Sequence, residues 1–458
     1  MAEQPRAYTP SELAERKLHR RAVEAAIWGM PLVNTDAMRQ AYFRDVGAKY
    51  KDICYFSKPA DWRFQVTTPN ASTNYVYFNF NLKNGPVVVE IPAAVGAGLL
   101  GSMVNSWDEP VADIGPAGED EGKGGKYLLL PPDFKGEPPT GYFNLRFPTY
   151  NGYALYRAIP AGSTEADVAA SLALVRKLGV YSLAEEAKPP QQRFIDIHGK
   201  TFDGITNFDE RFFESLNRMV QEEPIQQRDM VMMGMLKSIG IEKGKQFQPD
   251  AATQHIFREA GQEAQAQFVE SLTSYSHPWW PDRTWSPPDP TGVKTGFTYQ
   301  TPEALDVDAR GFANFAAFAM PKKTGKSLVY LFTFRDSHGD RLSGERNYTL
   351  HVPANVPAKQ YWSVIVYDVR SSALVRESPS VTLDSYNQSM KRNADGSIDI
   401  YFGPEAPEGK EANWIYTASG KPFFPAMRFY DPDKALFDRA WKLPDLEQAA
   451  AGQVRKVA

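Results

Sequence analysis

The stretch Tyr75-Val-Tyr-Phe-Asn-Phe80, followed by Asn84-Gly85 and Val87-Val-Val89, decides the fold of the N-terminal part of the chain. Valine and phenylalanine alternate with tyrosine and asparagine along the first stretch, which is the period of a half-buried β-strand. The Asn-Gly pair is a strong signal for a reverse turn, and a second apolar strand follows it. The sequence therefore predicts paired strands with one face turned toward a core.

Strand signals extend on both sides of this pair, from about Asp61 to Ala158. Further short strands are expected at Lys126–Leu130, Tyr142–Phe147 and Gly152–Arg157. Proline and glycine clusters separate them, and short strands broken by turns are typical of a β-sandwich or a barrel-like sheet.

Helices are predicted before and after this region. At the N-terminus, Thr9 and Glu12 form a Thr-x-x-Glu capping box, and Pro31 is expected to end the helix that the box opens. From about Ser163 to Phe318, apolar residues recur at helical spacing, and Thr164 opens the first of these helices.

Strands return near the C-terminus, at Leu328–Phe334, Tyr348–Val352, Tyr361–Asp368, Ile398–Phe402 and Ala426–Tyr430. We therefore predict an α+β fold, in which two antiparallel β-sandwich (jelly-roll-like) domains have a helical region between them. The expected domains are residues 1–160 (helix plus β-domain), 161–320 (helical region with a Pro/Trp-rich linker) and 321–458 (C-terminal β-sandwich).

The composition of the 458-residue chain disfavours several partners and locations. Lys and Arg number 51 against 55 Asp and Glu, so the net charge is −4 and no basic excess is available for nucleic acid. The longest apolar stretch, 93–104, is too short and too Gly-rich to span a bilayer, and residues 1–6 lack the apolar core of a signal peptide. We expect a soluble protein, cytoplasmic as the sequence stands and periplasmic if a leader has been removed.

The single cysteine, Cys54, allows no intrachain disulfide.

Several motifs, taken in order, resemble the bacterial family that pairs domain of unknown function 1254 with domain of unknown function 1214. The N-terminal motifs are Gly29-Met-Pro-Leu-Val33, Asn70-Ala-Ser-Thr-Asn-Tyr75, Gly85-Pro-Val-Val88, Gly125-Lys-Tyr-Leu-Leu129 with Pro131-Pro132, and Pro148-Thr149 with Arg157. The C-terminal motifs are Tyr348-Thr-Leu-His-Val-Pro353, Tyr361-Trp-Ser363 with Tyr367-Asp368, Asn393-Ala-Asp-Gly-Ser397, Asn413-Trp414 and Arg428-Phe-Tyr430. The resemblance implies two β-rich domains with a helical region between them, and it implies little about activity.

Two positions depart from the pattern of the family that the chain resembles. Ser72 stands where the motif usually has Asp, which removes a candidate acid, base or cation ligand. Near Glu377-Ser-Pro379, the usual Asn-Pro pair is altered.

The candidate site is a set of polar and aromatic residues on the predicted N-terminal β-domain: Asn70, Thr73, Tyr75, Trp107, Asp108, Lys126 and Arg157. In a shared pocket, Tyr75 or Asp108 would transfer a proton, and Arg157 or Lys126 would hold an anionic group. The remaining three would bind the substrate. Each residue also has a structural alternative, as a turn bond, a core side chain or an ion pair between strands. For Arg428, burial against a carboxylate such as Asp368 and exposure to solvent both remain open.

No metal or cofactor is expected. None of the six histidines stands in a metal-binding pattern. The segment Asp336-Ser-His-Gly-Asp340 fits a hairpin turn more simply than a calcium loop. The literal G-x-G-x-x-G match at 96–101 leaves no room for the helix that would bind a pyrophosphate.

Three functions remain open, and the polar-aromatic set favours the first. This is a metal-independent enzyme, a hydrolase or a lyase, that acts on a small organic molecule bound between the β-domain and the helices. The second is a binding or carrier protein that holds an apolar or aromatic ligand without turnover. The third is a structural or interaction protein whose sandwich edges associate as a homo-oligomer.

Overall fold

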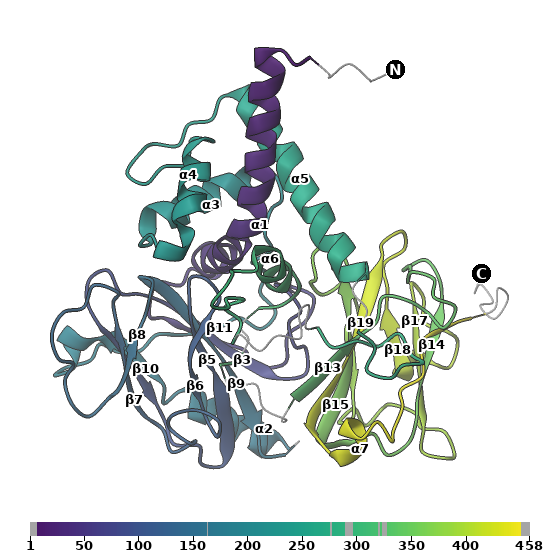
Figure 1. Ribbon diagram of the computed structural model, residues 1–458. Coiled ribbons are helices and arrows are strands. Elements are labelled where there is room, and N and C mark those ends of the chain that lie inside the picture. The colour runs from purple at the N-terminus through teal and green to yellow at the C-terminus, as the bar shows by residue number, and fades with distance from the viewer. Residues whose placement is uncertain are drawn as a thin grey trace.

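The computed structural model describes residues 7–162, 164–274, 277–288, 296–318, 321–322 and 328–449. Two β-sandwiches stand side by side, and a group of helices lies above them (Figure 1). The predicted α+β architecture, with a helical region between two sheet-rich domains, is confirmed.

The N-terminal sandwich consists of a six-stranded and a four-stranded sheet. The first has the order β11-β1-β3-β9-β5-β6, with β1 (Ile53–Tyr55), β3 (Asn74–Asn81), β5 (Ala97–Asn105), β6 (Pro110–Ile114), β9 (Asn151–Pro160) and β11 (Phe194–Asp196). The second has the order β10-β4-β7-β8, with β4 (Val87–Ile91), β7 (Gly125–Leu130), β8 (Phe143–Arg146) and β10 (Gly179–Ser182). Val76, Phe78 and Phe80 of β3 fill the core between the two sheets, as their alternation predicted.

The N-terminal sheets take up chain beyond residue 160. Strands β10 and β11 lie within the segment 161–320, and a separate short pair joins β12 (Phe202–Asp203) to β2 (Phe64–Gln65). Helix α2 (Glu165–Val175) packs against β5 and β9. β1 pairs with β11, and β4 pairs with β10. Each pairing satisfies backbone N–H and C=O groups that would otherwise be unpaired at a sheet edge.

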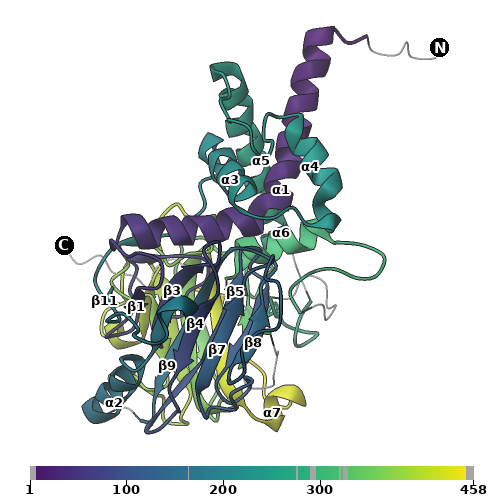
Figure 2. The same cartoon turned by 90° about the vertical axis from the view of Figure 1, so that its left-hand side faces the viewer.

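Helix α1 (Pro10–Arg44) begins as predicted but continues through Pro31. The capping box is confirmed, because the Glu12 N–H donates to Thr9 Oγ1 at 3.2 Å and the Thr9 N–H donates to the Glu12 carboxylate at 2.8 Å. The prediction that Pro31 ends the helix is wrong. A proline removes one backbone hydrogen bond and bends a helix, and here the residues around it are buried against α3, α5 and α6. Figure 2 shows the two limbs of α1 at a steep angle.

The helical region surrounds the upper limb of α1. It contains α3 (Glu210–Glu222), α4 (Met230–Lys237), α5 (Ala251–Ser274) and α6 (Val307–Ala316). Aromatic rings form its core, and Phe213 stacks on Phe257 with centroids 4.3 Å apart. None of the helices that the structure describes is both long and apolar enough to cross a bilayer.

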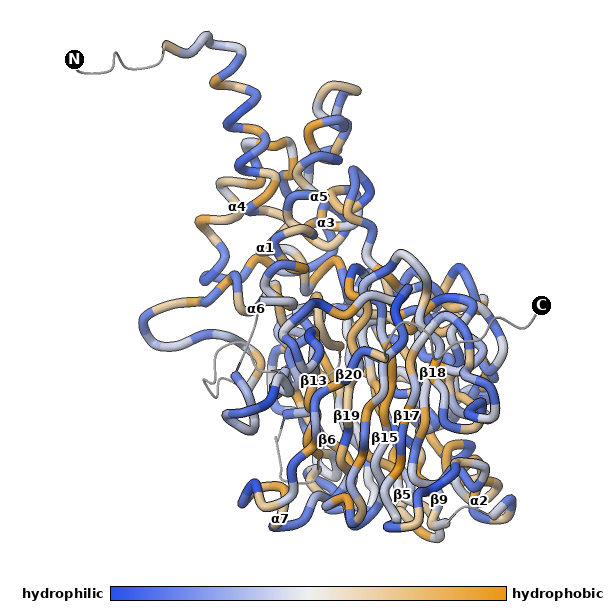
Figure 3. The backbone as a smooth tube through the Cα atoms, turned by 90° about the vertical axis from the view of Figure 1, so that its right-hand side faces the viewer, coloured by the Kyte–Doolittle hydropathy of each residue, from blue (hydrophilic) through white to orange (hydrophobic). Residues whose placement is uncertain are grey.

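The C-terminal sandwich is also built from two sheets. One has the order β13-β19-β15-β16, with β13 (Leu328–Phe332), β15 (Ala358–Asp368), β16 (Thr382–Asp384) and β19 (Phe423–Pro432). The other has the order β18-β17-β14-β20, with β14 (Tyr348–Val352), β17 (Ile398–Gly403), β18 (Trp414–Tyr416) and β20 (Glu447–Gln448). A short helix, α7 (Lys434–Phe437), follows β19. β15 and β19 are paired neighbours in one sheet, and Figure 3 shows the apolar residues along them. Their inward residues and those of β17 in the facing sheet form the core of this sandwich.

Candidate functional site

Strand alternation turns Tyr75 and Arg157 out of the N-terminal sandwich. The two are register partners on β3 and β9, while their chain neighbours Val76 and Tyr156 belong to the sandwich core. Because successive side chains leave a strand on opposite faces, Tyr75 and Arg157 lie on the outer face of the six-stranded sheet. The guanidinium carbon of Arg157 is 5.6 Å from the centroid of the Tyr75 ring.

The same alternation turns a second polar group out of the C-terminal sandwich. Tyr330, Arg428 and Ser363 are register partners across β13, β19 and β15. Their neighbours Phe429 and Val364 point into the core. The guanidinium carbon of Arg428 lies 4.6 Å from the centroid of the Tyr330 ring.

The loop 67–73, which precedes β3, joins the outer faces of the two sandwiches. The Thr68 carbonyl oxygen accepts a hydrogen bond from Arg428 Nη2 at 2.9 Å. The Pro69 carbonyl oxygen accepts one from the Tyr367 hydroxyl at 2.7 Å. Two successive peptide units of the N-terminal domain are therefore bound to the C-terminal sheet, and Arg428 is buried without contacting Asp368.

Asn70 continues this contact and holds two phenols. Its Nδ2 donates to the Tyr430 hydroxyl, and its backbone N–H donates to the Tyr75 hydroxyl at 2.9 Å. Its Oδ1 accepts from the N–H and the hydroxyl of Ser72, at 2.8 and 2.7 Å. The structure thus brings four of the predicted residues, Asn70, Thr73, Tyr75 and Arg157, to the junction of the two domains.

We call this junction the arginine–tyrosine cluster; it comprises Arg157, Arg428, Tyr75, Tyr330, Tyr361, Tyr367 and Tyr430. Tyr361 stacks on Tyr430 with ring centroids 4.0 Å apart, and Tyr386, which is half exposed, stacks on the other face of Tyr361 at 5.1 Å. A stack of three tyrosine rings therefore runs from solvent toward the two arginines.

The two arginines of the cluster have phenols rather than carboxylates as neighbours. Both guanidinium groups are surrounded by three phenols, those of Tyr75, Tyr330 and Tyr430. In the part of the chain that the structure describes, neither Arg157 nor Arg428 pairs with an acidic side chain. Burial opposes the charge, but the phenols raise the pKa of both arginines above its ordinary value. Because neither guanidinium is paired with a carboxylate of the described residues, both are candidates to pair with the carboxylate of a ligand.

The cluster separates the acidities of two adjacent tyrosines. Burial disfavours the phenolate of Tyr330, but Arg157 and Arg428 outweigh burial and lower its pKa below the ordinary value. Tyr430, whose ring centroid is 6.4 Å away, has a pKa raised well above that value, because burial and the charge of Tyr330 dominate there. A phenol with a lowered pKa beside one with a raised pKa is the arrangement expected of a base and an acid.

Several buried polar atoms at this junction have no hydrogen-bond partner among the described residues: Arg157 Nε, Arg428 Nε, Ser363 Oγ and Thr73 Oγ1. Buried polar groups in folded proteins are nearly always paired. Donors and hydroxyls that are unpaired around one charged centre therefore point to a polar ligand.

Trp107 and Asp108 lie at the opposite end of the same sheet. Leu100 of β5 is in register with Arg157. From there β5 continues for five residues, at roughly 3.3 Å each, before it reaches the turn that carries Trp107 and Asp108. The Trp107 ring is buried in the helical core, with the guanidinium carbon of Arg310 4.6 Å from its centroid. Asp108 accepts a hydrogen bond from the Tyr153 hydroxyl.

Lys126 also lies apart from the cluster, on β7 in the four-stranded sheet of the N-terminal sandwich. Its ammonium group is 3.1 Å from Glu90 and 3.0 Å from Glu186. Hydrogen bonds to these two carboxylates raise the pKa of Lys126 above its ordinary value. An ion pair between strands was the structural alternative for a basic residue of the candidate set, and Lys126 makes one.

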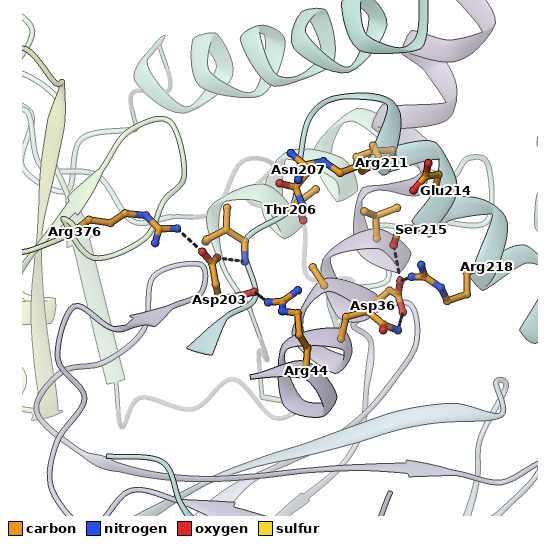
Figure 4. Close-up of a pocket in the computed structure, with 15 residues that line it drawn as sticks. Asp36, Arg44, Asp203, Thr206, Asn207, Arg211, Glu214, Ser215, Arg218 and Arg376 are labelled. Atoms are coloured by element: carbon orange, nitrogen blue, oxygen red, sulfur yellow. Dashed lines mark hydrogen bonds and ion pairs between the residues drawn. The ribbon is translucent and has the colours of Figure 1, made fainter. Parts of the chain in front are cut away.

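A pocket of ≈ 430 Å³ opens elsewhere, where α1, α3 and a loop of the C-terminal domain meet (Figure 4). Four arginines line it: Arg44, Arg211, Arg218 and Arg376. Each pairs with an aspartate; Arg376 lies 2.7 Å from Asp203, and Arg218 contacts the buried Asp36. The charges of these four arginines are therefore already matched by carboxylates of the chain.

Other candidate chemistries have structural explanations. Within the described segments, no three His, Cys, Asp or Glu side chains gather in a way that would hold a metal ion. Asp336 Oδ1 accepts the backbone N–H groups of His338 and Asp340, which confirms the hairpin turn. Burial raises the pKa of the Cys54 thiol to about 12, so this cysteine is a poor nucleophile.

Sequence reasoning missed Tyr330 and Tyr430 of the cluster and Ser363, which is the register partner of Arg428. A signal was present in Arg428-Phe-Tyr430 and in Tyr361-Trp-Ser363, where a core aromatic separates two polar side chains. That alternation places the polar side chains on one face of each strand. It does not reveal which surface covers that face.

The comparisons with known proteins agree with this two-domain arrangement. The family described as "Protein of unknown function (DUF1254)" matches residues 53–182, and the one described as "Protein of unknown function (DUF1214)" matches residues 327–434. No curated protein matches the chain.

Two solved structures resemble the chain over most of its length. The VPA0106 protein from Vibrio parahaemolyticus is 17% identical, covers 94% of this chain and 100% of its own, and has a TM-score of 0.55, which shows a shared fold alone. An uncharacterized protein from Burkholderia cenocepacia is 13% identical over 95% of each chain, with a TM-score of 0.42. Because the two family matches fall on the two β-domains in the order that the motifs predicted, the chain belongs to the family that joins a DUF1254 domain to a DUF1214 domain.

Proposed function

We propose that this chain is an enzyme that binds a small organic carboxylate between Arg157 and Arg428 and removes a proton from it with Tyr330. The observation that carries the proposal is the meeting of two guanidinium groups, one from each domain, around a phenol with a lowered pKa. Guanidinium groups pair with carboxylates in a bidentate geometry, and such pairs orient the bound molecule.

The chemistry that suits this arrangement is elimination, so we favour a lyase over a hydrolase. The Tyr330 phenolate takes the proton from the carbon next to the carboxylate. The two guanidinium groups stabilise the negative charge that develops on the carboxylate oxygens. The electron pair of the broken C–H bond forms a C=C bond, and the substituent on the next carbon leaves with its own bonding pair.

Tyr430 is the proposed acid of the same step. Its raised pKa keeps it protonated, and its ring lies 6.4 Å from that of Tyr330. It donates its proton to the departing oxygen, so an unsaturated acid and an alcohol are formed. Water then returns a proton to Tyr430 and accepts one from Tyr330, which restores the starting state.

The test is an untargeted mass-spectrometric comparison of a small-molecule extract before and after incubation with the purified protein. We expect one carboxylate to disappear far beyond the molar amount of protein, with an unsaturated product. Tyr330→Phe abolishes this turnover, whereas Tyr401→Phe, which alters a half-buried tyrosine of the other C-terminal sheet, leaves it unchanged.

The same experiment separates the other functions. A compound that is retained in equimolar amount without a product would make the chain a carrier protein. A compound consumed equally by wild type and Tyr330→Phe would overturn the role of Tyr330. If no compound is consumed or retained, the proposal fails, and light scattering would show whether the chain forms a homo-oligomer.

A further inference from the structure

Unpaired hydroxyl groups next to the arginine–tyrosine cluster indicate what the bound carboxylate carries besides its charge. Ser363 Oγ and Thr73 Oγ1 are both buried and lack a hydrogen-bond partner. A carboxylate held by the two guanidinium groups would not by itself satisfy these hydroxyls. A ligand that leaves them unpaired would lose affinity, since a buried hydroxyl without a partner is unfavourable.

The two hydroxyls come from the two different domains. Ser363 is the register partner of Arg428 on the C-terminal sheet, and its side chain lies on the same outer face. Thr73 directly precedes β3, two residues before Tyr75, and ends the loop whose Asn70 binds the hydroxyls of Tyr75 and Tyr430. A ligand that reaches both must carry hydrogen-bonding groups at two ends or around a ring.

The residues beside these hydroxyls are also polar. The Asn70 side chain lies within hydrogen-bond reach of Ser72 and Tyr430. The phenols of Tyr330 and Tyr430 face the same junction, where Arg157 and Arg428 influence the acidity of both. The junction is thus lined by hydroxyl, amide and guanidinium groups together with aromatic rings.

We propose, building on the function above, that the ligand is a polyhydroxylated carboxylic acid of the sugar-acid type. Its carboxylate pairs with Arg157 and Arg428, and its hydroxyls pair with Ser363 and Thr73. An oxygen substituent on the second carbon from the carboxylate supplies the leaving group that the elimination requires. A site built to hydrogen-bond hydroxyls discriminates strongly against analogues that lack them.

Isothermal titration calorimetry with three probes of the same ring size tests this inference. D-Glucuronate carries the carboxylate and the hydroxyls, cyclohexanecarboxylate carries the carboxylate alone, and D-glucose carries the hydroxyls alone. We expect glucuronate to bind at least about 10-fold more tightly than cyclohexanecarboxylate, and glucose not to bind measurably. Ser363→Ala and Thr73→Val should each weaken glucuronate binding at least about 5-fold and leave cyclohexanecarboxylate binding unchanged.

The outcomes distinguish this inference from the proposed function on which it rests. If cyclohexanecarboxylate binds as tightly as glucuronate, the ligand is a simple carboxylate, and the present inference fails while the carboxylate site stands. If neither carboxylate binds to a wild-type protein that unfolds cooperatively on heating, both proposals fail. Glucose binding as tightly as glucuronate would assign the site to a neutral sugar and overturn the role of the two arginines.

Discussion

Arg157 of β9 and Arg428 of β19 approach the same phenol, Tyr330, from two different domains, and neither has a carboxylate partner among the described residues. Each guanidinium lowers the pKa of Tyr330, and each disfavours the charge of the other. An anion between them would remove this repulsion. The contact between the domains is therefore the place where we propose that a carboxylate binds.

Replacing Arg157 should impair binding without impairing the fold. Arg157→Met removes a buried charge that has no acidic partner, so we expect the free energy of unfolding to stay within about 1 kcal/mol of wild type or to rise. Carboxylate affinity should fall at least about 10-fold, or about 1.4 kcal/mol. Denaturation and calorimetry measure the two effects, with Arg146→Met on β8 as the exposed control. A large loss of stability would mean that Arg157 has a structural role.

A carboxylate built into the chain should occupy the site. Ser363→Asp places an acidic group beside Arg428, its register partner, and supplies the missing counter-ion. We expect the melting temperature to rise and the binding of external carboxylates to be lost. Ser363→Asn is the neutral control of nearly the same size, and it should bind carboxylates at least about 10-fold more tightly than Ser363→Asp. Equal binding by both variants would place the ligand away from Arg428.

The lowered pKa of Tyr330 predicts a stability that depends on pH. In the folded state Tyr330 loses its proton at a lower pH than in the unfolded chain, where the pKa is about 10. At a pH between the folded-state pKa and the unfolded-state pKa of Tyr330, the unfolded state therefore holds more protons than the folded state. The stability due to Tyr330 rises with pH across this range. It is lost again as the pH falls through the folded-state pKa.

Tyr330→Phe is the variant that measures this dependence. The difference in melting temperature between wild type and Tyr330→Phe should grow as the pH rises toward 10, and a spectrophotometric titration should show one early-ionising tyrosine in wild type alone. Tyr401→Phe should follow wild type at every pH. A constant difference across the range would mean that Tyr330 does not ionise early.

Asn70 should stabilise the contact between the domains. Asn70→Ala removes the buried bond to Tyr430 and leaves that hydroxyl without its donor. We expect a loss of about 1–3 kcal/mol in the free energy of unfolding. The exposed Asn144→Ala on β8 should change it by less than about 0.5 kcal/mol. Similar values for the two variants, measured by chemical denaturation, would show that the Asn70 contact contributes little.

Two helical glycines should respond in opposite directions. A Cβ atom at Gly311 of α6 would lie 2.7 Å from the Ile27 carbonyl oxygen of α1, whereas one at Gly234 of α4 would meet no atom within 4 Å. We expect Gly311→Ala to destabilise the chain by about 1–3 kcal/mol through overpacking. Gly234→Ala should stabilise it by about 0.5–1 kcal/mol, because alanine favours a helix. Thermal unfolding of both variants checks the pair.

Much of the fold could be predicted from local patterns. The Thr9–Glu12 capping box, the alternation of Tyr75–Phe80 and the C-terminal strands are set by neighbouring residues, so they can be read along the chain. Pro31 shows the limit of such reasoning, because the packing of α3, α5 and α6 against α1 keeps the helix intact on both sides of the bend. The extra strands β10 and β11 depend likewise on the distant edges that they complete.

The candidate site divides in the same way. The sequence by itself determined which stretches form strands and that polar side chains alternate there with core residues, because alternation is a local property. The pairing of β3 with β9, which brings Tyr75 and Arg157 together, joins segments that are distant along the chain. Only the tertiary structure decided that Trp107, Asp108 and Lys126 lie elsewhere and that Arg428 and Tyr330 face Arg157. Arg157 stands 173 positions before Tyr330 and 271 before Arg428 in the sequence. The three residues meet because two sandwiches turn their outer faces toward each other, and charge and burial at that contact depend on both surfaces together.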